Sequence, residues 1–182
     1  MANESNDRKV IIAILLTSTL LTMLGIAGVL RGAYDLSLAP LPEDVRELYE
    51  PEDEVTDAEV QLLEAQVTNP YRRPLAAANV VVSALVLIGS FMLSWRRKLA
   101  LWWIKQAVVA KLLWIAVYTV SLVSHVKLTF APLPPDHPGG ALPEVIGGVI
   151  LISVFSGVLH VAAAYRATRP DIGEFIDTAT KS

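Results

Sequence analysis

The chain of 182 residues contains no cysteine, and none of its acidic residues lies in its long apolar segments. The absence of cysteine excludes disulfides, thiolate metal sites, iron–sulfur clusters and a cysteine nucleophile. Motifs for a Ser/His/Asp triad, a phosphate-binding loop or a metalloprotease are also missing, and no basic stripe indicates nucleic acid as a partner. The sequence therefore gives no ground for expecting an enzyme, a metal ion or a cofactor.

Charged residues make up only 18% of the chain, whereas 53% of the residues are apolar and the mean hydropathy is +0.49. The apolar residues gather in four runs, 10–30, 75–95, 102–123 and 145–165. Each run has about the 20 residues needed to cross a hydrocarbon core of about 30 Å, so four transmembrane helices are predicted. The first run is longer than the apolar part of a signal peptide, and no small-residue cleavage site follows it. We therefore interpret it as a retained anchor.

Basic residues gather in three segments that flank these runs, 1–9, 96–101 and 166–182. Because Lys and Arg are enriched in cytoplasmic segments, both termini are predicted to be cytoplasmic. Segments 31–74 and 124–144 are then extracytoplasmic. We expect a multi-pass protein of the plasma membrane or of a bacterial inner membrane, with the lipid bilayer as a partner.

A nine-residue phrase occurs twice, at 36–44 and at 128–136, with six identities and two similar pairs at an offset of 92. Each copy lies between two apolar runs, which predicts two parallel repeated helical hairpins. The alternative is a chance match between two proline-rich segments. The prolines end a helix and turn the chain along the interface, or they form a recognition surface for a partner. The repeated residues of interest are Pro40, Pro42, Asp44, Pro132, Pro134 and Asp136.

Acidic residues are concentrated in the first extracytoplasmic segment, because 11 of the 18 carboxylates lie between Asp35 and Glu64. Thr56 and Glu59 form a capping box there, which predicts a short helix over about 57–67. We expect a small acidic helical cap that either packs on the bundle as a solvated lid or docks a basic partner or a divalent cation. The candidate docking residues are Glu50, Glu52, Asp53 and Glu54, and their spacing does not match a calcium-binding loop.

Lys111 lies well inside the third apolar run, where a charged side chain costs on the order of 2.5–3.5 kcal/mol. Either it extends to the cytoplasmic headgroups beside Lys105, or it is a functional buried amine. Tyr118 follows seven residues later and shares the same helix face. No Asp or Glu lies in any of the four runs, so the carboxylate typical of proton-coupled pumps is missing.

Small and hydroxylic residues form stripes at helical spacing on three of the four runs. Asn79 and Ser83 belong to the stripe of the second run, and Gly157 and His160 to that of the fourth. Such stripes allow helices to approach closely in lipid, within one bundle or between chains. His125 and His160 differ in depth by about 20 Å, so they cannot both be axial ligands of one haem. We therefore expect His160 to form a hydrogen bond within its stripe.

The sequence thus predicts an all-α integral membrane protein with a four-transmembrane-helix bundle. The bundle is built from two parallel repeated helical hairpins, with a small acidic helical cap between the first two helices. Two classes of function remain for such a protein. The first is a non-enzymatic accessory or scaffold subunit that packs on other membrane subunits through its small-residue faces. The second is a small homo-oligomeric transporter, channel or lipid-handling protein. In that class the candidate functional residues within the membrane are Lys111, Tyr118, His160 and Asn79.

Overall fold

The computed structural model describes residues 2–37, 65–130 and 142–179. Its long elements are the helices α1 (Ala2–Ser37), α3 (Arg72–Ser94), α4 (Ala100–Phe130), α5 (Leu142–Ala167) and α6 (Pro170–Ala179). A short helical stretch at 65–68 precedes α3. The remaining sequence predictions for the loops fall outside the described residues: the repeated Pro40, Pro42, Asp44, Pro132, Pro134 and Asp136, the capping box, and the carboxylates Glu50, Glu52, Asp53 and Glu54.

Within the described ranges, four helices are long and apolar enough to cross a membrane. These spans are Asp7–Ser37, Arg72–Ser94, Ala100–Leu128 and Leu142–Ala167. The prediction of an all-helical protein with four such helices is confirmed. Helix α4 has 31 residues and so measures about 46 Å at 1.5 Å per residue, which exceeds a hydrocarbon core of about 30 Å.

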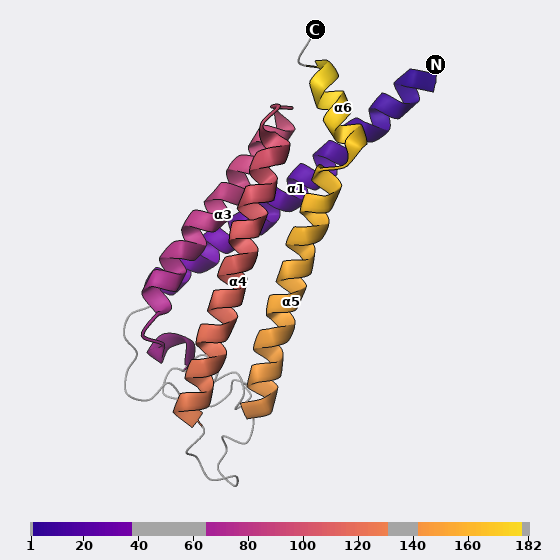
Figure 1. Cartoon of the computed structure of the whole chain (residues 1–182). Coiled ribbons are helices and arrows are strands. Elements are labelled where there is room, and N and C mark those ends of the chain that lie inside the picture. Colours follow the sequence, from indigo (N-terminus) through magenta and orange to yellow (C-terminus); the bar gives the residue numbers. More distant parts are fainter. Residues whose placement is uncertain (1, 38–64, 131–141, 180–182) are drawn as a thin grey trace, which may run out of the picture.

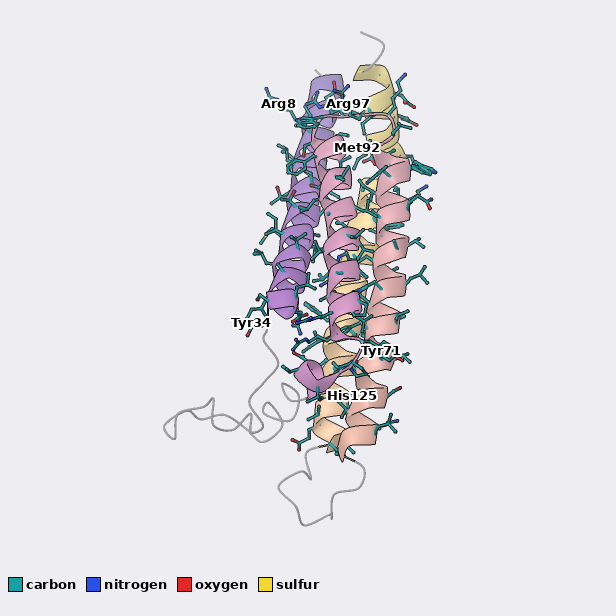
Figure 2. All side chains as sticks on the ribbon, turned by 90° about the vertical axis from the view of Figure 1, so that its left-hand side faces the viewer. Arg8, Tyr34, Tyr71, Met92, Arg97 and His125 are labelled. Atoms are coloured by element: carbon teal, nitrogen blue, oxygen red, sulfur yellow. The ribbon has the colours of Figure 1, made fainter. Side chains whose placement is uncertain are left out.

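The four long helices alternate in direction, so that α1 and α4 run one way and α3 and α5 return (Figure 1). The start of α1, the turn between α3 and α4, and α6 lie at one end of the bundle. Figure 2 places Arg8 and Arg97 at this end and Tyr34, Tyr71 and His125 at the other. The basic segments that the sequence groups on one side of the membrane therefore share one end of the bundle.

Helices α1 and α3 form the closest pair in the bundle, because glycines of α1 let the two backbones approach. A Cβ atom built on Gly32 would lie 2.9 Å from the carbonyl oxygen of Ala76 and 3.1 Å from the amide nitrogen of Val80. Nearer the basic end, Ser90 Oγ donates a hydrogen bond of 2.7 Å to the carbonyl oxygen of Ser18. The small-residue stripe of α3 is thus occupied by α1 of the same chain.

Helix α4 packs on α3, and α5 closes the bundle by packing on α4 and α1. The indole nitrogens of Trp103 and Trp114 donate to the carbonyl oxygens of Leu85 and Leu75, at 2.9 and 2.8 Å, and so tie α4 to α3 at two levels. Helix α5 packs on α4 and is the least enclosed of the four. The short helix α6 buries Ile172 and Ile176 in the apolar cluster at the basic end, which explains its position there.

We expect Gly32→Ala to lower the free energy of unfolding by about 1–3 kcal/mol, because the new methyl group meets backbone atoms of α3 that cannot rotate away. The matched control is Gly148→Ala on α5, where a Cβ atom has no neighbour within 4 Å among the described residues. Reversible unfolding in mixed detergent micelles measures both variants. Equal stabilities of the two variants would contradict the close α1–α3 contact.

Candidate functional site

Lys111 is buried between α3 and α4, with only 4% of its surface exposed. Its ammonium donates hydrogen bonds to Asn79 Oδ1 at 2.5 Å and to Ser83 Oγ at 2.9 Å. The nitrogen also lies 4.4 Å from the centre of the Trp114 ring, within the range of a cation–π interaction. Of the two alternatives left open by the sequence, the structure therefore favours the buried amine, because the side chain ends inside the bundle against α3.

Asn79 and Ser83 are presented to Lys111 by one face of α3, since they are one helical turn apart. Both are buried, and Ser83 Oγ donates to Asn79 Oδ1 at 3.2 Å. The amide nitrogen of Asn79 donates to the carbonyl oxygen of Gly28 on α1 at 3.1 Å, which fixes the orientation of the amide. Three helices thus contribute to the polar cluster of Lys111, Asn79, Ser83 and Gly28.

Gly28 is required by the geometry of this cluster. A Cβ atom at this position would overlap Ser83 Oγ and would lie 3.1 Å from the nitrogen of Lys111. The glycine therefore brings its own carbonyl oxygen to Asn79 while leaving room for the ammonium. A larger residue would separate α1 from the cluster.

The ammonium has no carboxylate partner among the residues that the structure describes; its hydrogen-bond partners there are a neutral amide and a hydroxyl. An ammonium carries three donor hydrogens, and these two bonds use two of them. Asp35, at the end of α1 away from the basic residues, instead pairs with Arg31 at 3.9 Å. The positive charge of Lys111 is therefore partly solvated by dipoles but is not neutralised.

A cavity of about 250 Å³ lies against the cluster and is lined by residues of α1, α3, α4 and α5. The cavity brings together the four candidate intramembrane residues, Lys111, Tyr118, His160 and Asn79. Tyr118 stacks on Trp114 with 5.1 Å between the ring centres, so an aromatic pair forms part of the wall. Apolar residues provide other parts of the wall: Leu24, Ala27, Ile115, Val149 and Ile152.

His160 contributes a buried nitrogen from α5. Its Nδ1 lies 2.7 Å from the carbonyl oxygen of Ser156. A carbonyl only accepts, so Nδ1 donates, and Nε2 of the neutral ring is left as an acceptor. Nε2 is buried and has no hydrogen-bond partner within the described part of the chain. The predicted hydrogen bond of His160 is thus made to its own helix rather than to a neighbouring one.

His125 lies at the opposite end of the bundle from Arg97 (Figure 2), near Thr68, whose Oγ1 is 2.9 Å from His125 Nε2. His125 is absent from the residues that line the cavity, whereas His160 lines it. No group of three or more His, Cys, Asp or Glu residues suited to a metal ion occurs in the ranges that the structure describes. The candidate site is therefore a cationic, partly apolar cavity.

Three members of the site were not identified from the sequence. Trp114 follows Lys111 by three residues and so shares its face, a spacing that could have indicated the cation–π contact. Gly28 stands between Gly25 and Gly32 at helical spacing and could have been added to the stripe of the first run. Arg31 lies at the end of that run, and only the fold shows that it lines the same cavity as Lys111.

We predict that Asn79 and Lys111 are energetically coupled. Asn79→Ala leaves the buried ammonium short of one hydrogen bond, and bonds to charged groups contribute about 1.5–3 kcal/mol. In a Lys111→Met chain the same substitution leaves no ammonium without a partner, so it is expected to lower the free energy of unfolding by less. Unfolding of the two single variants and the double variant in mixed micelles gives the coupling energy, expected at about 0.5–3 kcal/mol. Strict additivity would contradict the arrangement.

Comparison of the chain with models of protein families, with curated proteins and with solved structures finds no match. The chemistry of the cavity beside Lys111 is therefore the basis on which a function is assigned.

Proposed function

We propose that the protein is a small transporter, channel or lipid-handling protein that receives its ligand in the cavity beside Lys111. The single observation that carries the proposal is the buried ammonium of Lys111, which has neutral partners only among the described residues and lines a cavity of about 250 Å³. The cavity lies between helices that are long and apolar enough to span a membrane. A cationic and largely apolar cavity between such helices is suited to a ligand that enters the bilayer.

The energetic argument favours a binding role over a purely structural one. A lysine within a membrane span costs several kcal/mol, and ionisable residues at such positions mark ligand or ion routes more often than packing contacts. An interface between helices is achieved more readily with small residues alone, as the contact between α1 and α3 demonstrates. The cost of Lys111 is therefore explained by a function at this position.

In the proposed topology the basic end of the bundle is cytoplasmic, in the plasma membrane or in a bacterial inner membrane. The support is the location of Arg8 and Arg97 at one end (Figure 2) and the excess of Lys and Arg in segments 1–9, 96–101 and 166–182. The described carboxylate Asp35 lies toward the opposite end, on the same helix as Tyr34.

We also propose that the chain arose from two parallel hairpins. Helices α1 and α4 run in the same direction (Figure 1), and their buried positions coincide at an offset of 90 residues. Val10, Ile14 and Leu21 correspond in this way to Ala100, Ile104 and Lys111. The repeated phrase has an offset of 92, so the two registers agree if the second copy carries two extra residues between these buried positions and the phrase. Related chains whose two halves align along their whole length would support duplication, and related chains that keep only one of the phrases would oppose it.

The proposed function is tested by the access of water to position 111. Because the chain has no cysteine, Lys111→Cys introduces a single thiol. We expect a small charged methanethiosulfonate reagent to label this thiol in membrane vesicles, since the cavity admits water. Ser156→Cys, an isosteric change in the same cavity, serves as a second probe that leaves the polar cluster intact.

Two controls make the labelling decisive. Leu113→Cys places a thiol on the outer surface of the same helix, where 64% of the leucine is exposed to the surroundings of the bundle, and it is expected to resist the reagent in lipid. Arg97→Cys is expected to react only from the cytoplasmic side. If positions 111 and 156 were as unreactive as position 113, the cavity would be closed to water and the proposed function would be wrong. Labelling of position 97 from the outside would show that the topology is the reverse of the one proposed.

A second candidate function is the accessory or scaffold subunit, and one observation on α5 favours it. A Cβ atom on Gly147 or Gly148 would meet nothing within 4 Å in the part of the chain that the structure describes, so this pair of glycines is open to another helix there. Small residues on a helix surface allow a partner helix to approach in lipid. By contrast, Ser83 and Ser90 of α3 are completely or nearly completely buried within the chain and are not available to a partner.

The scaffold candidate predicts that the protein is recovered with unrelated membrane subunits after purification in a mild detergent, and that Gly148→Leu releases them. Native mass spectrometry measures the subunit composition. The second variant for comparison is Leu151→Ala, which reduces the side chain on another exposed position of α5 without blocking a close approach. Recovery of the chain alone or as a homo-oligomer would oppose the scaffold candidate and agree with the transport or lipid-handling candidate.

A further inference from the structure

We propose that the cavity beside Lys111 binds an amphiphile with a single negative charge, whose headgroup contacts Lys111 and whose apolar tail leaves the cavity between α1 and α5. This inference rests on the proposed function, because it assigns a chemical class to the ligand of the same cavity. It is carried by three observations on the cavity wall: the charge balance, an unpartnered polar atom, and the position of the apolar residues.

The charge balance of the wall specifies one negative charge. Among the residues that the structure describes, Lys111 and Arg31 are the lysine and arginine that line the cavity, and no Asp or Glu of those residues lines it. Arg31 lies 3.9 Å from Asp35, so its charge already has an opposite neighbour. Lys111 has only Asn79 and Ser83 as hydrogen-bond partners among the described residues, and one of its three donor hydrogens remains for a ligand oxygen. A monoanionic headgroup completes the balance.

The unpartnered atom is Nε2 of His160, on the side of the cavity formed by α5. It is buried, and the hydrogen bond from Nδ1 to Ser156 leaves it as an acceptor. A buried acceptor without a donor is unfavourable, so a ligand hydroxyl or a water molecule carried in with the headgroup stabilises this wall. The cavity therefore offers a donor to an anionic oxygen at Lys111 and an acceptor to a hydroxyl at His160.

The apolar residues of the wall determine where the tail lies. Leu24 and Ala27 come from α1, and Val149 and Ile152 from α5, two helices that contact each other far less than α1 contacts α3. Ile152 is 62% exposed, so this side of the cavity reaches the surface of the bundle that faces lipid. A ligand with an apolar chain can enter here from the bilayer without leaving it.

The size of the cavity limits the part of the ligand that it holds. Its volume of about 250 Å³ is slightly below the range of about 300–1,000 Å³ that is usual for pockets enclosing a whole small molecule. A headgroup and the first carbons of a chain fit this space, while the rest of the chain lies against α1 and α5 in lipid. An amphiphile satisfies both the charge of Lys111 and the open apolar side.

Binding is tested on the full chain, purified in a mild detergent and freed of lipid, by native mass spectrometry. The probes are oleate, oleyl alcohol with the same tail and no charge, acetate with the same charge and no tail, and dioleoyl phosphatidylglycerol, whose headgroup is also a monoanion. Oleate, the phospholipid or both are expected to bind. Oleyl alcohol and acetate are expected to bind at least about tenfold more weakly, a factor that corresponds to about 1.4 kcal/mol. Which of the two binds identifies the source of the headgroup, a free fatty acid or a membrane phospholipid.

Matched variants connect binding to the cavity. Lys111→Met is expected to lose at least about tenfold in affinity, whereas Lys105→Met, the same change at an exposed position of α4, keeps the affinity of the unmodified chain. Ala27→Phe fills the cavity from α1 without removing any hydrogen bond of Lys111, and it is expected to block the tail. Its control is Met23→Phe, at an exposed position of α1 outside the cavity wall.

The outcomes separate this inference from the function on which it rests. The assignment of an anionic amphiphile would be overturned by any one of three results. These are equal binding of oleyl alcohol and oleate, equal losses of affinity in the Lys111 and Lys105 variants, and binding of acetate as strong as that of either amphiphile. If position 111 were labelled from water while neither amphiphile bound, the inference would fail and the proposed function would remain. If position 111 were closed to water as well, both would fail.

Discussion

One ammonium group without a described counter-ion determines much of the architecture around it. The charge of Lys111 requires oxygen dipoles at short range, and Asn79 and Ser83 supply them from one face of α3. The amide of Asn79 in turn needs an acceptor for its nitrogen, which is the carbonyl oxygen of Gly28. That carbonyl can approach only because residue 28 has no side chain. The close packing of α1 on α3 is therefore linked, contact by contact, to the charge on α4.

The identity of the partners explains why the site is suited to a ligand. A carboxylate placed beside Lys111 would form an ion pair and remove the net charge from the cavity. Two hydrogen bonds donated by an ammonium to neutral acceptors contribute about 1.5–3 kcal/mol each, against an effective cost of several kcal/mol for taking such an ion out of water. The two amounts are of similar size, so the chain tolerates the buried lysine while its charge remains available to an anion. Asn79 and Ser83 thus stabilise the site without saturating it.

The sequence predicted the four long helices because the length and apolar character of a membrane span are local properties of the chain. It placed Lys111, Tyr118, His160 and Asn79 among the candidates because their polarity is unusual in such segments, and the structure brings all four to one cavity. It could not decide how Lys111 is solvated, because that depends on which residues of α3 face α4. Gly28 and Arg31 were missed for the same reason: their contacts join different helices, and no pattern within one helix specifies which neighbour it meets. Trp114 lies on the same helix as Lys111, and its spacing of three residues was a local signal that was not used. The predicted helix over 57–67 lies mostly outside the described residues, as does the rest of the acidic cap.

The small-residue stripes illustrate how the same pattern can serve different interactions. On α3 the stripe is used within the chain, since Ser83 and Ser90 lie against α1. On α5, a Cβ atom added to Gly147 or Gly148 would meet no described residue within 4 Å, although these residues are equally small. The polar cluster is held by α1, α3 and α4, whereas α5 is the least enclosed of the four helices and provides one wall of the cavity. In the proposed function, helix packing and ligand access therefore depend on different faces of the bundle: the contact between α1 and α3 stabilises the charge, and the apolar side between α1 and α5 is where we propose that the ligand enters.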